Sequence, residues 1–528
     1  MDETKALNGE TKMNGFNGET KALNGKMYPQ INNDLNKPLT KLKPLGLRSK
    51  AVMRQVTKVI LANLSVVSGG MALGYPAVTL KQLTDPIYSN ALTVSQASWF
   101  ASINAISCPL GGLLSGYLLD KIGRKGTIIT INFTAIIAWL IMATAFHEEN
   151  LAFFIQIMIS RFVIGITTGL SSSPCGVYAA EVCHPNLRGR LTLGTSIGTA
   201  LGIFLIYTMG YFIRNDWRLI SILAGSYAVF ALLLSFSIPE SPSWLLSKKR
   251  QEESKKVHRY FRGLKKTDNY CYEEIDIEFS RMEKAALNPI GQKKKKFVKM
   301  LRKPEVWKPL LIMIGFFGCQ QFSGIFVVIV YAVQFSIEAG VNIDPVLCAM
   351  MVGLTRMVTT FLVGYLLDKW GRRPPALMSG FGMAICMMLL AGCTWFPALA
   401  DVPYLPVGCI VMYIFTSTLG LMTLPFSMIS EVYPQKVRGQ CAGITICFGY
   451  LMSFIIINRY PFMVENMGKE NVFAFYGVVS LLAILFIYFF LPETKGKSLH
   501  EIEEYFIYGK SGKPAEPTEV EMKEIFVK

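Results

Sequence analysis

The chain has 528 residues, of which 52% are hydrophobic and only 17% are charged, and its mean hydropathy is +0.37. This composition excludes an ordinary soluble enzyme, and four histidines without a nucleophile motif, a phosphate-binding loop or a metal-ligand cluster leave no evident catalytic centre. The net charge of +17 is not accompanied by an aromatic-interleaved basic face, so nucleic-acid binding is not indicated. We expect a membrane protein that is not an enzyme and has neither cofactor nor metal.

The first 50 residues are polar and contain ETKALNG twice, which is typical of a disordered tail. Beyond them, apolar runs of about 20 residues recur, and each is long enough to cross a hydrocarbon core about 30 Å thick. The predicted spans have the approximate limits 56–80, 97–119, 126–146, 151–180, 191–212, 217–239, 307–335, 345–367, 374–396, 404–430, 437–463 and 471–491. They form two groups of six.

The gap between the groups, residues 240–306, holds eighteen Lys or Arg against ten Asp or Glu. Basic residues beside membrane spans are retained in the cytoplasm and can also attract anionic lipid. We therefore expect a multi-pass protein of the plasma membrane with both termini in the cytoplasm. The predicted segments are a disordered N-terminal tail (1–55), a six-helix bundle (56–239), a basic helical linker (240–306), a second six-helix bundle (307–491) and a C-terminal tail (492–528).

A ten-residue phrase occurs twice, as GYLLDKIGRK at Gly116–Lys125 and as GYLLDKWGRR at Gly364–Arg373, at an offset of 248 residues. We expect the first glycine of each copy to let adjacent helices approach closely. Asp120 and Asp368 are expected to be buried at helix ends, where each needs a partner. The chain is therefore built from two related halves.

Two further charged patterns recur in the same order, and we predict that they pair with the phrases to form a gate. An ion pair across the seam between the halves would close the cytoplasmic side; a purely structural latch is the alternative. The candidate gating residues are Asp120, Arg124, Glu181, Arg188 and Glu240 in the first half and Asp368, Arg372, Glu431, Arg438 and Glu493 in the second.

These motifs, with SRFVIGITTG, PESPSWL, QQFSGI and PETKG, resemble those of the sugar porters of the major facilitator superfamily, from about Val56 to about Ile502. The stretch Gly69–Leu83 is most similar to the insect trehalose-transporter-like branch. The resemblance implies an all-α membrane protein with twelve transmembrane helices in two six-helix bundles. It also implies a central site that is exposed to each side of the membrane in turn.

In that family the tandem glutamines of the seventh helix bind sugar hydroxyls, and they correspond to Gln320 and Gln321. Ser323 and Gly324, which follow after Phe322, predict a point where this helix is weakened. The other sugar-site positions of the family fall on Ser196, Phe326, Arg356, Phe426 and Gly449. Few amides therefore remain to bind sugar hydroxyls.

Arg356 stands near the middle of the span 345–367, too far from either end for its charge to reach water along the helix. We expect it to face the central cavity. There it could pair with a carboxylate such as Glu181 or Glu431, bind an anionic substrate, or block a sugar.

In proton-driven members of the family an Asp follows the Gly-Tyr of the first helix and is linked to an arginine of the fourth. Here Gly74 and Tyr75 are followed by Pro76, whereas the arginine is present as Arg161 and joins the candidate gating residues. The resemblance without the carboxylate favours facilitated diffusion.

The leading prediction is a monomeric uniporter of a small sugar such as trehalose or a hexose. One alternative is an organic-anion carrier that uses Arg356, and another is a sugar sensor that moves no solute.

Overall fold

The computed structural model describes residues 49–87, 91–146, 150–214, 216–263, 279–280, 282, 300–396, 399, 402–434, 437–497 and 499–508. The predicted N-terminal tail up to residue 48, most of the basic linker between 264 and 299, and residues 509–528 lie outside the described residues. The described residues form helices joined by turns, with no strand among them, which confirms the all-α prediction.

The chain divides into two compact units, one made of residues 1–54 and 245–291 and the other of residues 55–244 and 292–528. In the first unit, Nη1 of Arg54 donates to the carbonyl of Tyr260 at 2.9 Å and its guanidinium lies 4.7 Å from the centre of that ring. Both predicted bundles belong to the second unit, called here the membrane unit.

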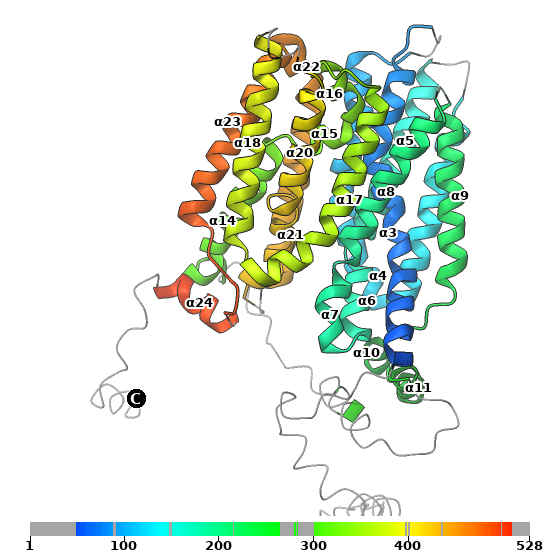
Figure 1. The fold of residues 1–528 in the computed structure, drawn as a ribbon. Helices are drawn as coiled ribbons and strands as arrows, with labels where there is room; N and C mark the ends of the chain where they lie inside the picture. The colour runs from blue at the N-terminus through cyan, green and yellow to red at the C-terminus, as the bar shows by residue number, and fades with distance from the viewer. Residues whose placement is uncertain are drawn as a thin grey trace, which may run out of the picture. The chain divides into compact units, whose positions relative to one another are not determined.

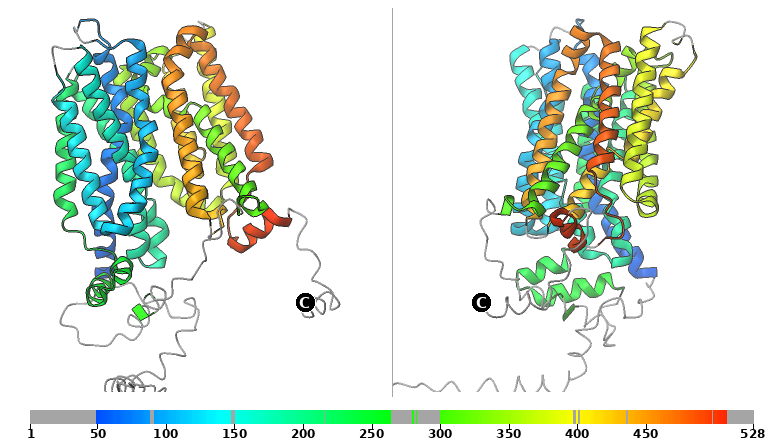
Figure 2. Two further views of the ribbon diagram at one scale, coloured as in Figure 1. Left: turned by 180° about the vertical axis from the view of Figure 1, so that it is seen from behind. Right: turned by 90° about the vertical axis from the view of Figure 1, so that its left-hand side faces the viewer.

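The helices follow the predicted two halves of the chain (Figures 1 and 2). The first half and the segment after it contain α3 (Ser49–Leu83), α4 (Val94–Ala143), α5 (Asn150–Leu170), α6 (Pro174–Val182), α7 (Pro185–Thr192), α8 (Gly194–Phe212), α9 (Trp217–Ser235), α10 (Pro242–Ser247) and α11 (Gln251–Phe261). The second half contains α14 (Pro304–Phe322), α15 (Ile325–Val330), α16 (Ala332–Glu338), α17 (Pro345–Trp370), α18 (Arg373–Trp395), α20 (Leu405–Leu419), α21 (Leu424–Val432), α22 (Arg438–Met467), α23 (Lys469–Phe490) and α24 (Leu499–Tyr508).

Local sequence determines where several of these helices begin. Thr93 accepts from the backbone N–H of Gln96 at 3.3 Å while the Gln96 side chain accepts from the backbone N–H of Thr93, which closes a capping box at the start of α4. Asp216 and Asp344 cap α9 and α17 through their side chains.

Ten helices of the described residues are long and apolar enough to cross a membrane. One of them, α4, is 50 residues long and carries two predicted spans, which meet at Gly123 with φ +84°. The predicted span 307–335 is divided among α14, α15 and α16 and is not among the ten. The ten helices are therefore consistent with the twelve predicted crossings.

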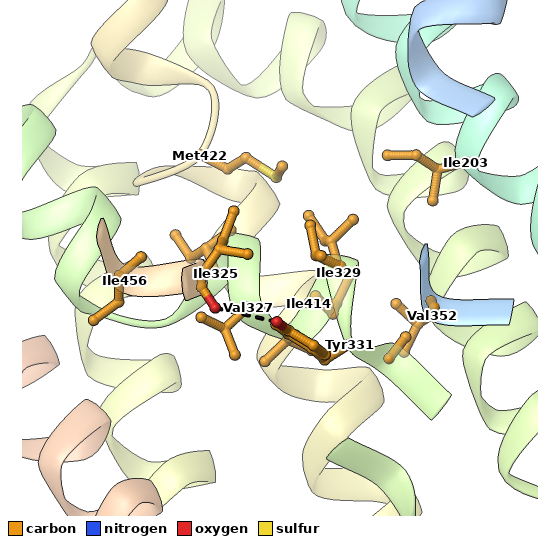
Figure 3. Close-up of a cluster of buried hydrophobic side chains, with 14 of the residues drawn as sticks. Ile203, Ile325, Val327, Ile329, Tyr331, Val352, Ile414, Met422 and Ile456 are labelled. Carbon is orange, nitrogen blue, oxygen red and sulfur yellow. Dashed lines mark hydrogen bonds between the residues drawn. The ribbon is translucent and has the colours of Figure 1, made fainter. Parts of the chain in front are cut away.

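The seventh span breaks at Gly324, whose φ is +89°, as Ser323 and Gly324 predict. Tyr413 donates from its hydroxyl to the freed carbonyl of Ser323 at 2.7 Å. Figure 3 shows the short helix α15 packed among side chains of neighbouring helices: Ile203 of α8, Val352 of α17, Ile414 of α20 and Ile456 of α22. A break at membrane depth is tolerated because it is buried in protein rather than exposed to lipid.

Glycines allow close packing of α4 on α5, but not where we expect it. A Cβ at Gly111 would lie 2.0 Å from the carbonyl oxygen of Ile166, so only glycine permits this approach. A Cβ at Gly116 would meet nothing within 4 Å, so the prediction of close packing at this first residue of the phrase is wrong. At its counterpart Gly364 a Cβ would lie 2.4 Å from the end of the Leu193 side chain, with no backbone atom among its near neighbours.

Candidate functional site

A cavity lies within the membrane unit between the two halves. It encloses about 1200 Å³ of space, which includes a part open to solvent. It is lined by Val66, Gly69, Leu73, Thr168, Ser171, Ser172, Thr195, Ser196, Thr199, Phe317, Gln321, Phe326, Arg356, Thr360, Thr418, Met422, Thr423, Phe426, Ile446, Gly449, Tyr450 and Ser453. The structure thus brings six of the seven predicted substrate residues to one cavity: Ser196, Gln321, Phe326, Arg356, Phe426 and Gly449.

Gln320 is the seventh, and it does not line the cavity. Its side-chain amide donates to the carbonyls of Leu421 and Met422, both at 2.9 Å. These carbonyls belong to the turn between α20 and α21, where the tenth span is interrupted and leaves backbone groups without helical partners. The resemblance implies that both glutamines bind sugar hydroxyls, but the amide of Gln320 already donates to the protein's own backbone.

Gln321 and Arg356 each bring an unpaired polar atom to the cavity. The Gln321 side chain is 2% exposed and its Oε1 has no hydrogen-bond partner in the described part of the chain. Arg356 is 8% exposed, and its Nη1 likewise has no partner there. Glu181 and Glu431, the predicted structural partners of Arg356, instead pair with Arg124 and Arg372.

Apart from Ser196, the residues that bring hydroxyl groups to the cavity wall were not predicted as site residues. Thr195, Ser196 and Thr199 line it from α8, and Thr168, Ser171 and Ser172 from α5 and its end. Spacings of three and four residues place such side chains on one face of a helix, which is the signal that could have identified them. In this site, hydroxyls take the place of the amides that the resemblance leads one to expect.

A smaller cavity adjoins the first and shares Leu73, Phe326, Tyr450 and Ser453 with it. Arg161 lines this second cavity and is 1% exposed. Its Nη1 donates to the carbonyl of Ala72 at 2.7 Å and its Nε to that of Phe100 at 3.2 Å. Arg161 therefore ties α5 to α3 and α4, and it lies apart from the charged networks that carry the repeated phrases.

The first network lies at the end of the first half that carries the repeated phrase, called here the motif end. Nη2 of Arg124 donates to Oε1 of Glu181 at 2.5 Å, and the hydroxyl of Ser241 donates to the other oxygen of Glu181, also at 2.5 Å. The carboxylate of Glu240 accepts from the backbone N–H groups of Arg124 at 2.9 Å and Lys125 at 3.2 Å. These contacts join α4, α6 and the segment after α9.

The second network repeats the first with the equivalent residues of the second half. Arg372 donates to Glu431 from Nη2 at 2.8 Å and from Nε at 3.1 Å, while Thr494 donates to the same carboxylate at 2.5 Å. Glu493 accepts from the backbone N–H groups of Arg372, Arg373 and Lys495. Burial by itself would raise the pKa of Glu493, but these N–H groups and the charge of Arg372 outweigh it and lower that pKa.

A glycine in each phrase makes room for the second carboxylate. Gly123 has φ +84° and Gly371 has φ +90°, a region that residues with a side chain rarely adopt. A Cβ at Gly123 would lie 2.4 Å from Oε2 of Glu240, and one at Gly371 would lie 2.9 Å from the carboxylate oxygens of Glu493. The Gly-Arg pair of the phrase is thus a turn that wraps around a carboxylate.

Three predicted members of the networks are placed differently. Asp120 is exposed, so the prediction of a buried carboxylate is wrong there; its backbone carbonyl accepts from Nε1 of Trp244 at 3.2 Å. Arg188 is exposed on α7, and Nε of Arg438 donates to the carbonyl of Tyr433 at 3.3 Å. The side chain of Asp368 lies outside the described residues.

The hypothesis of a gate placed ion pairs across the seam. In the described part of the chain, the Arg124–Glu181 pair lies within the first half and the Arg372–Glu431 pair lies within the second. The polar contacts that we describe between the halves lie toward the opposite end, called here the far end. Arg214, after α8, pairs with Asp344, before α17, and Nδ2 of Asn458 donates to Ser102 at 3.2 Å. Tyr207 also donates across the seam, to the carbonyl of Ile329. In this conformation the halves are joined at the far end.

Two helical halves around a cavity lined by polar and apolar side chains, with the same charged network in each, define a multi-pass membrane transporter of the major facilitator type. The family described as "Sugar (and other) transporter" matches residues 56–506. The facilitated trehalose transporter Tret1 of Culex quinquefasciatus is 31% identical over 453 residues, which are 84% of this chain and 85% of that protein. The chain belongs to this family, which confirms the predicted resemblance.

The facilitated trehalose transporter Tret1 of Aedes aegypti is 32% identical over 453 residues, which are 84% of this chain and 54% of that protein. The chain thus spans about half the length of this relative. Among solved structures, the inward open conformation of the xylose transporter XylE from E. coli has a TM-score of 0.71 at 24% identity and covers 85% of this chain and 99% of its own. This likeness confirms the fold.

Proposed function

We propose that the protein moves a small sugar across the membrane by facilitated diffusion, with the central cavity exposed to each side in turn. The observation that carries this proposal is the wall of the cavity, where serine and threonine hydroxyls from both halves surround Gln321. A site of this kind suits a solute with many hydroxyl groups, because polar groups that leave water must find partners.

The hydroxyls of the wall serve mainly as acceptors. Thr199 donates its proton to the carbonyl of Thr195 at 3.0 Å, Thr360 to that of Arg356 at 2.7 Å, and Thr418 to that of Ile414 at 2.8 Å. A hydroxyl oxygen that has donated its proton still has lone pairs to offer. Such oxygens can accept from the hydroxyl groups of a bound sugar.

Uniport without proton coupling is supported by the absence of a titrating carboxylate beside the cavities. No Asp or Glu lines either cavity among the described residues. Pro76 occupies the place of the family's proton-linked Asp, and Arg161 donates to backbone carbonyls instead of pairing with a carboxylate. A buried group with a pKa near neutrality is what proton coupling would require.

We propose that each motif-end network keeps its own half rigid while the halves rotate against each other. Arg124, Glu181 and Glu240 fix three segments of the first half, and Arg372, Glu431 and Glu493 do the same in the second. Rigid-body rotation of one bundle against another requires that each bundle hold its internal contacts. The far-end contacts would then separate when the cavity opens to that side.

We further propose that the motif end faces the cytoplasm of cells whose plasma membrane holds the protein, and that the protein acts as a monomer. Lys121, Arg124 and Lys125 in one half and Lys369, Arg372 and Arg373 in the other give this end its excess of basic residues, which favours cytoplasmic retention. Both termini would then be cytoplasmic.

The proposal is tested by counterflow of radiolabelled sugars into liposomes that contain the purified full-length protein. Gln321→Leu removes an acceptor from the cavity and should lower uptake roughly tenfold, as expected for a lost hydrogen bond in a buried site. Gln440→Leu is the matched control, since this glutamine is exposed at the start of α22. If no sugar, polyol or sugar acid crosses faster than into empty vesicles, the proposed function is wrong; dependence of uptake on a proton gradient would refute uniport.

A further inference from the structure

Arg356 is an unneutralised cation inside the transport site. It lines the cavity from the middle of α17, and only 8% of its surface is exposed. Its Nη1 has no hydrogen-bond partner in the described part of the chain. One turn earlier, a Cβ at Gly353 would lie 3.0 Å from Cα of Phe204, so α17 packs tightly on α8 there. The backbone that carries Arg356 is thus held close to the opposite half, and its charge cannot withdraw toward water along the helix.

The surroundings offer this cation no protein counter-ion. Among the described residues, the linings of the two adjoining cavities contain two arginines, Arg356 and Arg161, and no carboxylate. Glu181 and Glu431 are engaged with other arginines at the motif end. An unpaired charge in a poorly solvated site is energetically unfavourable. A ligand with a negative charge would pair with the guanidinium and so bind more tightly than a neutral ligand of the same shape.

The cavity has one charged donor and several uncharged acceptors, and this division indicates which groups the ligand should carry besides its negative charge. Arg356 supplies the free donor and the charge, whereas Gln321 Oε1 and threonine oxygens such as those of Thr199 and Thr418 supply acceptors. A guanidinium matches the planar, two-oxygen geometry of a carboxylate. The acceptors match the hydroxyl groups of a sugar.

We propose that the substrate of this cavity is a sugar acid, a polyhydroxylated solute with one carboxylate that Arg356 binds. The inference rests on the proposed transport function and names the chemical class of the solute. A neutral sugar leaves the charge of Arg356 uncompensated, and a small inorganic anion leaves the hydroxyl wall unused. A sugar with one carboxylate satisfies both.

The experiment compares uptake of radiolabelled D-glucuronate, D-glucose and trehalose by the full-length protein in liposomes, with the membrane potential set by a potassium gradient and valinomycin. Glucuronate uptake should exceed that of the neutral sugars, and an inside-positive potential should accelerate it, because uniport of a monoanion moves charge. Arg356→Gln should lower glucuronate uptake at low concentration by about tenfold or more, and Arg356→Lys should retain part of it. Arg302→Gln removes the same charge from an exposed position before α14 and should have no effect.

A measurement on the wild-type protein avoids any folding defect of the variants. Glucuronate should raise the melting temperature of the protein in detergent more than glucose does at equal concentration. The inference would be overturned if the protein took up neutral sugars but no glucuronate, and if Arg356→Gln took up neutral sugars as fast as the wild type. Sugar transport itself would then still stand. Stabilisation by glucuronate without any uptake would support the binding site and refute the transport function.

Discussion

The two ends of the membrane unit use polar contacts differently. At the motif end, Arg124 with Glu181 and Arg372 with Glu431 join helices of the same half. At the far end, Arg214 with Asp344 and Asn458 with Ser102 join one half to the other. Under the proposed rotation of the halves, motif-end contacts would persist, whereas far-end contacts would break and re-form.

The largest effect should follow from filling the space that each phrase reserves for its carboxylate. Gly123→Ala places a Cβ at φ +84° and 2.4 Å from Oε2 of Glu240, and we expect a loss of about 3 kcal/mol in stability together with loss of transport. Thermal unfolding in detergent and uptake into liposomes would measure both. Gly116→Ala, seven residues earlier in the same phrase, has open space around its Cβ and should be neutral or slightly stabilising; equal damage from the two would contradict the assigned role of Gly123.

A smaller loss is expected when one motif-end carboxylate is neutralised. Glu431→Gln leaves Arg372, whose side chain is 21% exposed, without its charge partner, and should reduce stability by about 2 kcal/mol after allowance for partial solvation. Chemical or thermal unfolding would measure it. Glu305→Gln breaks the more exposed pair with Lys303 and serves as the control, with an expected change within about 0.5 kcal/mol.

At the far end the expected effect is on conformation rather than on stability. Arg214→Gln breaks a pair whose side chains are 55% and 27% exposed, so unfolding should change by less than about 1 kcal/mol. The halves should separate more often at this end, which spin labels at the exposed positions Phe212 and Ile337 would show as longer distances. Arg214→Lys keeps the positive charge and leaves the Asp344 cap of α17 in place, so it should keep the shorter distances; longer distances in this variant too would count against a latch.

The smallest effect concerns the pH dependence contributed by Glu493. Its pKa is lowered in the folded protein, so its contribution to stability is fully present above the usual value of 4.5 and is lost as the pH falls through the lowered pKa. Glu493→Gln should therefore melt below the wild type at pH 7, by less than about 1 kcal/mol because the group is partly solvated. The difference in melting temperature between Glu493→Gln and the wild type should become smaller at the acidic end of the range in which the protein stays folded. A difference that grows as the pH falls would contradict this.

The fold was predictable because membrane spans are long and apolar, and because charged phrases at the ends of spans recur in the same order. The break at Gly324 was also predictable, since Ser and Gly adjoin there. The direction in which each side chain points was harder to predict. Lipid and protein core are both apolar, so the two sides of a membrane helix differ little in hydrophobicity. Gln320 and Gln321 show this, because adjacent amides point to a backbone turn and to the cavity, respectively.

The site was predictable where a single residue broke the apolar pattern, as Arg356 does. It was not predictable where the polar groups were as ordinary as Thr195 or Thr199, whose hydroxyls donate to backbone carbonyls three or four residues earlier in the chain. The role of Gly123 escaped the sequence for another reason. Gly123 is required by its positive φ and by the carboxylate of Glu240, which lies 117 residues further along the chain. In the sequence, such a glycine cannot be distinguished from one that lets two helices pack closely.

The interrupted seventh span has a consequence for amide hydrogen exchange. Five of the six residues of α15 are buried, and only Phe326 is turned to the cavity. Burial limits the access of solvent to backbone amides, so this segment should exchange slowly although the span is interrupted. Any movement of α15 would then carry Phe326 against the substrate as one intact turn, without local unfolding.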